Sequence, residues 1–517
     1  MSWEPDVEEI RKQSEMARQM GGKKGVDFQH SRGKLTVRER VDLLQDPGSF
    51  REIGTLTGTP TWEGDRVVDL KPSNTVTGTC HVEGRKIALS GGDFTIRGGS
   101  ADGTMATKNQ FVERLALNTR IPYVRLLDAT GGSVKTFESI GRTYLPGNLS
   151  TALAAELLQN IPVVSAVMGS VAGAPAIQAC MCHFSVMVKD TSQVFVAGPK
   201  VVEQATGQAI TKEELGDEHT QVKNGVIMNL AQDEGDAISQ VRKFLSYMPS
   251  NVWEAPPRSE PEDDPGRRDE SLLSVIPKHR RKVYEPRKVF DAVLDKGSFF
   301  EIMPLYGKAR ITGLARVNGV PVAIMANNPK FNGGSMDIAA GEKTIRLVEL
   351  ADTFHLPLVY FADEPGFTVG PAQEKAGILR AGARIMSVIA RSRTPFISII
   401  MRQLYGVSGG LHWRGTGMYR RYAWPSTHGG SMHIEGGTAI AYKREIESAD
   451  DPDAKRAEIE ARLQAISSPF RNAHAFGIED LIDPRETRPL LVDFIEDAWK
   501  LIQTQLGPSG SSRSYTP

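Results

Sequence analysis

Residues 161–175 read IPVVSAVMGSVAGAP and combine a strand pattern with a turn made of small residues. The first half is apolar and β-branched, which is typical of a buried strand. The chain then turns at Gly173-Ala174, and residues 176–179 have the composition of a helix start. A turn with so little side-chain bulk exposes backbone N–H groups, which can stabilise negative charge on a substrate oxygen. We therefore predict an oxyanion-binding turn between a strand and a helix.

The same stretch recurs later in the chain as part of an ordered series of repeats. The pattern D-x-G-S-F-x-E-I occurs near residue 50 and again near residue 299. Downstream, matched residues follow at offsets of 235 and then 233, as small loop insertions would produce. Among them are Gly98-Gly99 with Gly333-Gly334, Lys108 with Lys343, Asp128 with Asp363, Gly131 with Gly366, Met168 with Met401 and Gly173 with Gly406. Because the unit is far longer than a solenoid repeat, the series predicts two homologous domains.

Strands and helices alternate within each copy, which predicts an α/β fold. In the first copy a hairpin pattern is followed by helix, strand, helix and strand patterns at residues 75–89, 104–117, 123–127, 150–159 and 161–167. A Pro-rich, charged segment separates the two copies. We predict an N-terminal domain, a linker, a C-terminal domain and a flexible tail at residues 1–255, 256–270, 271–517 and 507–513.

The overall composition argues against several function classes. The net charge is zero, with 62 basic and 62 acidic residues, so no global field attracts nucleic acid or an anionic membrane. No run of 18 apolar residues occurs, and the acidic N-terminus resembles neither a secretory signal nor a transit peptide. Three cysteines cannot build a disulfide framework, which favours a reducing compartment. We expect a cytoplasmic protein that binds neither nucleic acid nor membranes.

Two equivalent turns follow predicted strands, at Asp128 to Gly131-Gly132 and at Asp363 to Gly366-Phe367. Ligands of α/β sheets bind beyond the carboxyl ends of strands, so the paired turns are candidate binding segments. A plain glycine turn is the simpler alternative for either copy alone. The two aspartates could form an acid–base pair, although an Asp in this place more often caps the turn that follows.

Two further groups of side chains suggest metal ligands at first sight. Cys180-Met181-Cys182-His183 lacks a second ligand pair at zinc spacing and lies in apolar sequence, so buried thiols are favoured. His428, His433 and Glu435 are flanked by glycines and fit a loop better. Phosphate-loop, dinucleotide and nucleophile-elbow motifs are missing, so neither a nucleotide nor a serine nucleophile is expected. The remaining candidate is a site built from two glycine turns, without a metal.

The chain resembles the carboxyltransferase (β) subunit of biotin-dependent acyl-CoA carboxylases, the propionyl-CoA and acetyl-CoA carboxylase group. The likeness covers about residues 30–505. In the first half its markers are KLTVRER at 34–40, DPGSF at 46–50, DFT at 93–95, GGS at 98–100, AGA at 172–174, VMVKDTS at 186–192 and EELG at 213–216. In the second half they are PGF at 365–367, QE at 373–374, GILRAGA at 377–383, YG at 405–406, AWP at 423–425, KREI at 443–446 and IDPRETR at 482–488.

The resemblance implies two tandem homologous crotonase-like ββα superhelix domains. It assigns the acyl-CoA thioester to the amides of Gly173 and Ala174, and the biotin oxygen to those of Gly406, Val407 and Ser408. Substrate contacts are expected at Gly98, Gly99, Gly131, Gly132, Gly333, Gly334, Gly366, Phe367 and Gly410. In the implied reaction carboxybiotin loses CO₂, the biotin anion takes the α-proton, and the thioester enolate attacks CO₂.

Partners and cofactors follow from the same resemblance. Biotin is expected on a carrier protein together with a biotin carboxylase, acyl-CoA is the substrate, and no metal is expected in this subunit. The assembly is expected to be a hexamer, either of this chain alone or mixed with a second β-type subunit. The site would lie between the N-terminal domain of one protomer and the C-terminal domain of another.

Departures from the family pattern fall at the two turns themselves. The usual Ala-Gly-Gly-Ala and Tyr-Gly-Gly-Ala become AGAP at residues 172–175 and YGVS at residues 405–408, and an Arg expected after Gly131-Gly132-Ser133 is missing. Gly409-Gly410 would leave extra room for the acyl group, which favours a long chain without fixing its length. Alternatives are a related decarboxylase or transcarboxylase subunit, or a catalytically silent structural subunit of a mixed complex.

Overall fold

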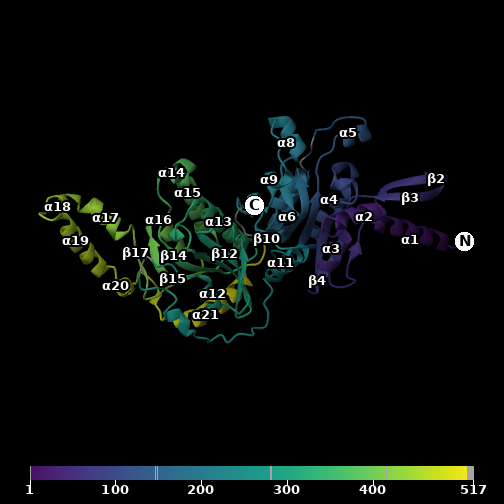
Figure 1. Ribbon diagram of the computed structural model, residues 1–517. Coiled ribbons are helices and arrows are strands. Elements are labelled where there is room, and N and C mark those ends of the chain that lie inside the picture. The colour runs from purple at the N-terminus through teal and green to yellow at the C-terminus, as the bar shows by residue number, and fades with distance from the viewer. Residues whose placement is uncertain (1, 146, 148, 280–281, 415, 509–517) are drawn as a thin grey trace. The chain divides into compact units, whose positions relative to one another are not determined.

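The computed structural model describes residues 2–145, 147, 149–279, 282–414 and 416–508. The chain divides between Glu254 and Ala255 into two compact units, called here the first unit and the second unit (Figure 1). Residues 509–513 of the predicted tail lie outside the described residues. Each unit is built around its own eight-stranded sheet.

The sheet of the first unit has the order β1-β4-β5-β6-β7-β8-β10, with β9 beside the end of β7. Its first three strands pair antiparallel, and the strands from β5 onward pair parallel. The bounds are β1 (Arg51–Glu52), β4 (Thr75–Val82), β5 (Arg85–Gly92), β6 (Tyr123–Ala129), β7 (Val163–Ala172), β8 (Phe184–Val188), β9 (Gln193–Phe195) and β10 (Asn229–Ala231). The continuous apolar run of β7 is buried as predicted, because neighbouring strands and helices cover it.

Two pairs of helices pack on this sheet. α4 (Ala106–Thr119) lies on β4 and β5 and against α6 (Leu149–Asn160), while α3 (Val37–Leu44) packs on α11 (Glu234–Tyr247), β4 and β5. Thr36 begins α3 with a capping box to Glu39, and the apolar face of α3 is buried. The shorter helices are α5 (Lys135–Ile140), α7 (Ala174–Cys180), α8 (Pro199–Thr206), α9 (Lys212–Gly216) and α10 (Glu218–Gln221).

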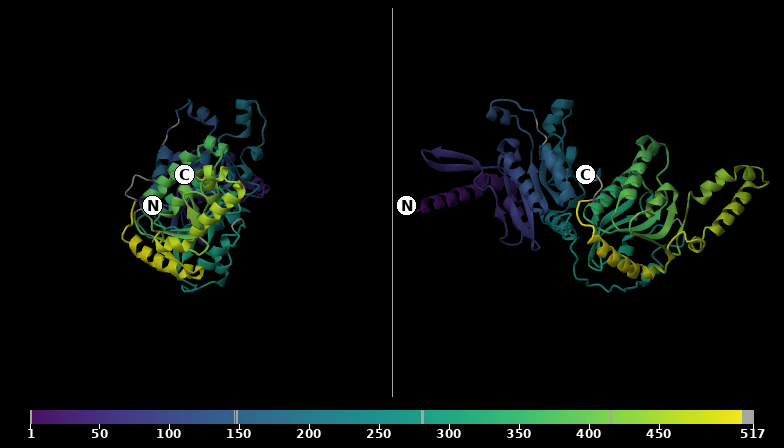
Figure 2. Two further views of the ribbon diagram at one scale, coloured as in Figure 1. Left: turned by 90° about the vertical axis from the view of Figure 1, so that its left-hand side faces the viewer. Right: turned by 180° about the vertical axis from the view of Figure 1, so that it is seen from behind.

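An N-terminal extension projects beyond the sheet of the first unit (Figure 2). It consists of α1 (Glu4–Arg18), α2 (Gly22–His30) and the hairpin of β2 (Gly58–Glu63) with β3 (Arg66–Pro72). α1 lies against β3.

The second unit repeats the same architecture. Its sheet has the order β11-β12-β13-β14-β15-β16-β18, with β17 beside the end of β15. The strands are β11 (Phe300–Ile302), β12 (Arg310–Val317), β13 (Val320–Asn327), β14 (Leu358–Glu364), β15 (Phe396–Tyr405), β16 (Tyr419–Ala423), β17 (His428–Gly430) and β18 (Asp480–Leu481). α13 (Ile338–Thr353) packs with α15 (Ile378–Arg391), as α4 does with α6, and α12 (Arg287–Val293) packs with α21 (Thr487–Ile502).

The remaining helices of the second unit are α14 (Pro371–Ala376), α16 (Gly406–Gly409), α17 (Ile434–Ala441), α18 (Lys443–Glu447), α19 (Pro452–Ile466) and α20 (Pro469–His474). α17 and α18 pack on α19, and this helical group extends beyond β17 (Figures 1 and 2). No helix in the described part of the chain is both long and apolar enough to cross a bilayer.

The two units also match in the residue-by-residue pairing of their strands. Ala129 pairs with Val171 after an irregularity in the first unit, and Glu364 pairs with Leu404 after the matching irregularity in the second. The predicted offsets of 235 and 233 therefore describe structurally equivalent positions. The twin lysines behave alike, since Lys108 donates to the carbonyl of Thr75 and Lys343 to that of Arg310, each at 2.8 Å.

The predicted linker packs on the second unit. Arg258 pairs with Glu496 of α21, and Ser259 donates its N–H to the carbonyl of Gly319 at 3.0 Å. Arg488, also in α21, donates to the carbonyl of Asp264 at 2.8 Å. The segment is thus anchored along its length, despite its Pro-rich and charged composition.

Candidate functional site

The turn after β7 has the conformation that its glycine allows. Gly173 has a φ of +67°, in the left-handed region, and α7 starts at the next residue. The N–H of Gly173 donates to the carbonyls of Val196 at 3.1 Å and Phe195 at 3.3 Å. The N–H of Ala174 lies in the first turn of α7, where a helix offers no acceptor of its own. Ala174 is also exposed, so its amide is the more available of the two predicted donors.

The turn after β15 has the same conformation. Gly406 has a φ of +64° and leads into α16, whose first turn includes Val407 and Ser408. Both of their N–H groups lie where the helix provides no acceptor. Val407 is exposed, whereas the side chain of Ser408 is buried. The two turns are therefore equivalent in place and in backbone conformation.

The two departures from the family pattern fall at conformationally ordinary positions. Ala174 and Val407 are each the residue that follows the left-handed glycine, and both have negative φ within a helix. A side chain is tolerated at such a position because Cβ clashes arise at positive φ. The glycine that each turn requires, Gly173 or Gly406, is present.

The other predicted glycines gather around the turns to different degrees. Gly131 approaches the β7 end so closely that a Cβ there would lie 2.5 Å from the carbonyl oxygen of Ala172. Its carbonyl accepts from Ala101 at 2.8 Å, and the equivalent Gly366 carbonyl accepts from Met336 at 3.0 Å. The loops containing Gly98, Gly99, Gly333 and Gly334 are thereby tied to these strand ends. Gly98, Gly99, Gly333 and Gly334 all have positive φ.

Three predicted contacts lie farther from the turn backbones. A Cβ on Gly132 would meet no atom within 4 Å, so Gly132 lies on the open rim. Gly410 follows α16 directly, and a Cβ there would lie 3.7 Å from Cε of Met386, an ordinary contact. The ring of Phe367 packs on Gly382 of α15, where a Cβ would approach Cζ at 2.8 Å. Phe367 therefore forms part of the wall against α15.

Asp128 is a buried ion-pair partner whose hydrogen bonds go to side chains, so the prediction of a turn cap is wrong for it, while the acid–base alternative stays a prediction. Its Oδ2 lies 2.7 Å from Nζ of Lys34 and 3.1 Å from Nη1 of Arg40, and it also accepts from Gln29 at 3.1 Å. Arg40 in turn pairs with Glu234 at 2.7 Å. Burial is the largest influence on Lys34 and lowers the pKa of its ammonium, while Asp128 opposes that shift.

Asp363 occupies the equivalent place with a different partner. Its Oδ2 lies 2.8 Å from Nη2 of Arg402, and its Oδ1 accepts from the N–H of Gln403 at 3.0 Å. Both members of the ion pair are buried. Asp363 therefore neutralises a neighbouring strand residue and does not cap the turn that follows it, which corrects the turn-cap prediction.

The sequence reasoning missed one carboxylate at the second turn. Glu364 is fully buried, and its Oε1 lies 3.2 Å from Oγ of Ser408. It follows Asp363 directly, and a charged residue ending a buried strand could have drawn attention to it.

The candidate metal ligands are engaged elsewhere. In His183, Nδ1 accepts from the N–H of Val163 and Nε2 faces the carbonyl of Leu158, both at 3.0 Å. His428 bonds the hydroxyl of Tyr405 at 2.9 Å, and His433 bonds the carbonyl of Pro365 at 2.9 Å. Across the described ranges, no three His, Cys, Asp or Glu side chains form a group suited to a metal ion.

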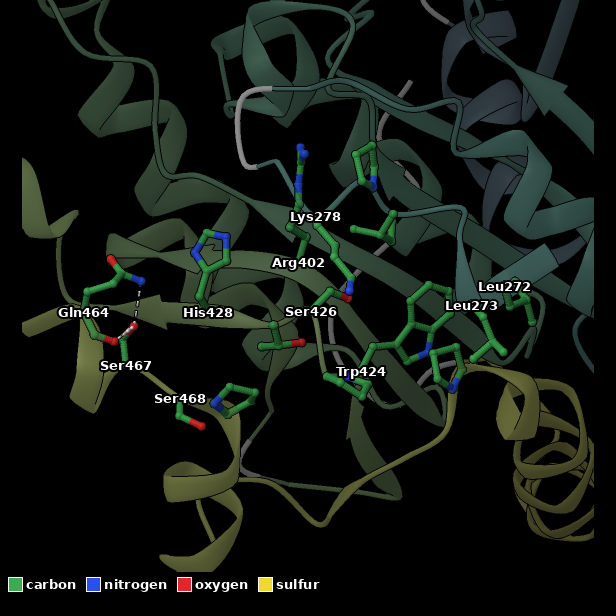
Figure 3. Close-up of a pocket in the computed structure, with 16 residues that line it drawn as sticks. Leu272, Leu273, Lys278, Arg402, Trp424, Ser426, His428, Gln464, Ser467 and Ser468 are labelled. Carbon is green, nitrogen blue, oxygen red and sulfur yellow. Dashed lines mark hydrogen bonds between the residues drawn. The ribbon is translucent and has the colours of Figure 1, made fainter. Parts of the chain in front are cut away.

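The second unit also contains a cavity of about 530 Å³, which His428 lines but none of the residues predicted at the glycine turns does (Figure 3). Trp424 lies near Leu272 and Leu273 at one side, and Gln464 bonds Ser467 at the other. Arg402 also lines the cavity, and its guanidinium forms the ion pair with Asp363. The cavity is therefore distinct from the turn at Gly406.

Comparison with known proteins agrees with this geometry. A family model described as a carboxyl transferase domain matches residues 28–506. The chain is 34% identical to the propionyl-CoA carboxylase carboxyltransferase subunit of Haloferax mediterranei, over 95% of this chain and 96% of that protein. It is 33% identical to the methylmalonyl-CoA carboxyltransferase 12S subunit of Propionibacterium freudenreichii subsp. shermanii, over 95% of this chain and 93% of that protein.

A solved structure extends the likeness to three dimensions. The hexameric transcarboxylase 12S, solved with methylmalonyl-coenzyme A and methylmalonic acid bound, matches with a TM-score of 0.88 at 30% identity. The match covers 100% of this chain and 99% of that one. The predicted crotonase-like α/β fold and carboxyltransferase activity are confirmed, and the chain belongs to the carboxyl transferase family of biotin-dependent enzymes.

Proposed function

We propose that this chain moves a carboxyl group from carboxybiotin, held at the turn of the second unit, to the α carbon of an acyl-CoA held at the turn of the first unit. The observation that carries the proposal is the pair of equivalent strand-to-helix turns, each with a left-handed glycine and an available amide after it. Two such turns suit a reaction in which two carbonyl oxygens acquire negative charge.

The residues of the chain serve mainly to bind and to hold charge. The amide of Ala174 would donate to the thioester oxygen, with Gly173 fixing the turn through its bonds to Val196 and Phe195. The amides of Val407 and Ser408 would donate to the biotin oxygen. Carboxybiotin would supply both the carboxyl group and, after releasing it, the base for the α-proton.

The carboxylates at the strand ends are consistent with a base that comes from carboxybiotin. Asp128, Asp363 and Glu364 are buried, and each is paired with a cation. Buried ion pairs of this kind have a structural role, because losing one partner leaves the other charge buried and uncompensated. In the proposed reaction the base is therefore assigned to the biotin substrate.

A catalytically silent subunit is the less supported reading. The argument for a silent subunit is that Ala174 and Val407 replace glycines of the usual motif. Both residues have negative φ, which a residue with a side chain adopts without strain. The amides that would hold the two oxygens are retained, since a side-chain change leaves the N–H in place. A related decarboxylase or transcarboxylase role would use the same half-reaction, and the acyl chain length is left open.

The direct test uses the purified full chain with free biotin and a panel of malonyl-type CoA esters. We expect biotin-dependent loss of the carboxyl group, and the reverse reaction when carboxybiotin carrier is supplied with short and long acyl-CoAs. The acyl-CoA consumed fastest would identify the chain length. If no acyl-CoA yields product, in a preparation free of other β-type subunits, the proposal is wrong.

The same proposal includes a hexamer and a biotin-bearing partner in the cytoplasm. Exposed apolar side chains lie close to both turns, such as Ile177 and Val196 in the first unit and Val407 in the second. Apolar surface of this kind marks contact faces. Three cysteines are too few for a disulfide framework, which is compatible with a reducing compartment. Light scattering should give six times the chain mass, and a monomer would contradict the assembly.

A further inference from the structure

The side chain of Glu364 connects four segments of the second unit. Its Oε2 accepts from Nη2 of Arg310 in β12 at 2.7 Å and from Nδ2 of Asn327 in β13 at 3.0 Å. Its Oε1 accepts from Oγ of Ser408 in α16 at 3.2 Å and from the N–H of Gly366 at 3.3 Å. Both carboxylate oxygens are therefore fully used inside the protein.

A second layer of hydrogen bonds fixes these partners. Nη1 of Arg310 donates to the hydroxyl of Tyr360 at 3.0 Å, and that hydroxyl donates to Oδ1 of Asn327 at 2.8 Å. Arg310, Asn327, Tyr360, Glu364 and Ser408 are all buried. Burial opposes the charge on Arg310, but Tyr360 and Glu364 raise the pKa of its guanidinium on balance. Among the described residues, Nε of Arg310 is the one polar side-chain atom of these five residues without a hydrogen-bond partner, so the network is almost fully satisfied, as in rigid buried networks.

Among the residues that the structure describes, the Glu364–Ser408 bond has no counterpart at the first turn. The strand register places Ala129 where the second unit has Glu364. The matching offset places Pro175 where it has Ser408, and neither residue can form this bond. The fold that the two units share therefore does not require the Glu364–Ser408 contact. The contact is specific to the second turn.

We infer that Glu364 is a positioning residue for the carboxybiotin side of the reaction, an inference that rests on the proposed function. It ties the start of α16, through Ser408, to the loop at Gly366 that faces the same turn. It also brings Arg310 beneath the turn as a neutral ion pair, so that the carboxylate does not repel an anion held by the turn amides. The oxygen-binding amides are thereby fixed before the substrate arrives.

The first test is Ser408→Ala, which removes the hydroxyl and leaves the Glu364–Arg310 pair intact. Free biotin and a malonyl-type CoA are varied separately in the biotin-dependent reaction. Loss of a hydrogen bond to a charged group corresponds to about a tenfold change, so we expect kcat/KM for biotin to fall about tenfold. KM for the CoA ester should stay within about twofold. An unchanged kcat/KM for biotin would overturn the inference.

The second test is Glu364→Gln, alone and combined with Ser408→Ala. If Glu364 acts through Ser408, the second substitution should cost less in the Glu364→Gln background than in the wild type. Glu113→Gln is the matched control, because Glu113 is a buried partner of Arg125 in the first unit. It should lower thermal stability while leaving KM for biotin unchanged. Fully additive effects would show that Glu364 has only a structural role.

These outcomes are separable from failure of the proposed function. Absence of transfer by the wild-type chain with every CoA ester contradicts the function itself. An active wild type whose Ser408→Ala variant keeps the wild-type kcat/KM for biotin contradicts only the role of Glu364.

Discussion

Asp128 and Asp363 occupy the same backbone position in the two units but are neutralised by different residues. Arg402 lies on the strand next to Asp363, and its equivalent in the first unit is Gly169. A Cβ on Gly169 would lie 2.1 Å from Oδ1 of Asp128 and 2.5 Å from Nζ of Lys34, so this ion pair fills the space that a side chain there would take. A buried carboxylate requires a cation, and each unit supplies it from a different part of the chain.

This difference predicts unequal effects of removing a cation. Arg402→Met leaves Asp363 without an ion-pair partner among the described residues, and should lower the free energy of unfolding by about 3–5 kcal/mol. Lys34→Met should cost less, because Arg40 remains 3.1 Å from Asp128. Denaturant unfolding with hydrogen exchange to separate the units measures both. Equal losses would contradict the account.

His183 predicts a pH dependence of stability. Its ring is buried, and burial lowers its pKa to about 3, while an unfolded histidine has a pKa of about 6.5. The stabilisation is therefore complete above pH 6.5 and is lost progressively as the pH falls toward 3, by at most about 1.4 kcal/mol per pH unit. In thermal unfolding between pH 7.5 and 5, His183→Gln should have a lower midpoint and a flatter pH profile.

The exposed His474 provides the control for this measurement. His474→Gln should follow the wild-type profile throughout. If the His183→Gln and wild-type profiles run parallel, another group causes the acid sensitivity.

For single residues, local sequence patterns predicted helix caps and turns but not the buried charge network. The capping box of Thr36 and Glu39 was visible because its members are three residues apart. Arg310, Asn327, Glu364 and Ser408 come from four separate segments, so no spacing connects them. The bonds from Gly173 to the 195–196 loop are similarly non-local, which is why its amide looked available from sequence alone.

At the scale of elements, the strand-to-helix turn depends on one glycine, not on two. The left-handed angle is confined to Gly173 and Gly406, and the next residue already has helical geometry. Sequence comparison with the family suggested an altered turn, because a motif records residue types without their dihedral angles. The second glycine of the usual motif is conformationally dispensable in this fold.

Val407→Gly tests this conclusion by restoring the usual motif. The new glycine would lie in the first turn of α16 and should cost at most about 1 kcal/mol of stability. We expect kcat for carboxyl transfer to stay within about threefold of the wild type, as measured with free biotin. A rise of more than about tenfold would show that Val407 impairs the turn.

For the complete chain, the duplicated sequence pattern was the most reliable guide to the domain organisation. Ordered offsets predicted two related units, because small insertions preserve the spacing of core and turn residues. The anchored segment at 256–270 was harder to predict, since its ion pair and hydrogen bonds reach residues as distant as Glu496. Pro-rich, charged composition indicates a lack of regular structure, not a lack of contacts.

The duplicated turns predict that the two substrates can be affected separately. Gly173→Ala and Gly406→Ala would each place a Cβ at positive φ, with the nearest atom beyond the flanking residues 4.0 Å away, so the effect is conformational and not steric. Forcing a left-handed angle on alanine costs about 1–2 kcal/mol, enough to shift either turn and reduce kcat/KM roughly tenfold. Gly173→Ala should lower kcat/KM for the CoA ester, and Gly406→Ala that for biotin. Each variant is the control for the other, and losses that fall on the same substrate would refute the assignment of one turn to each.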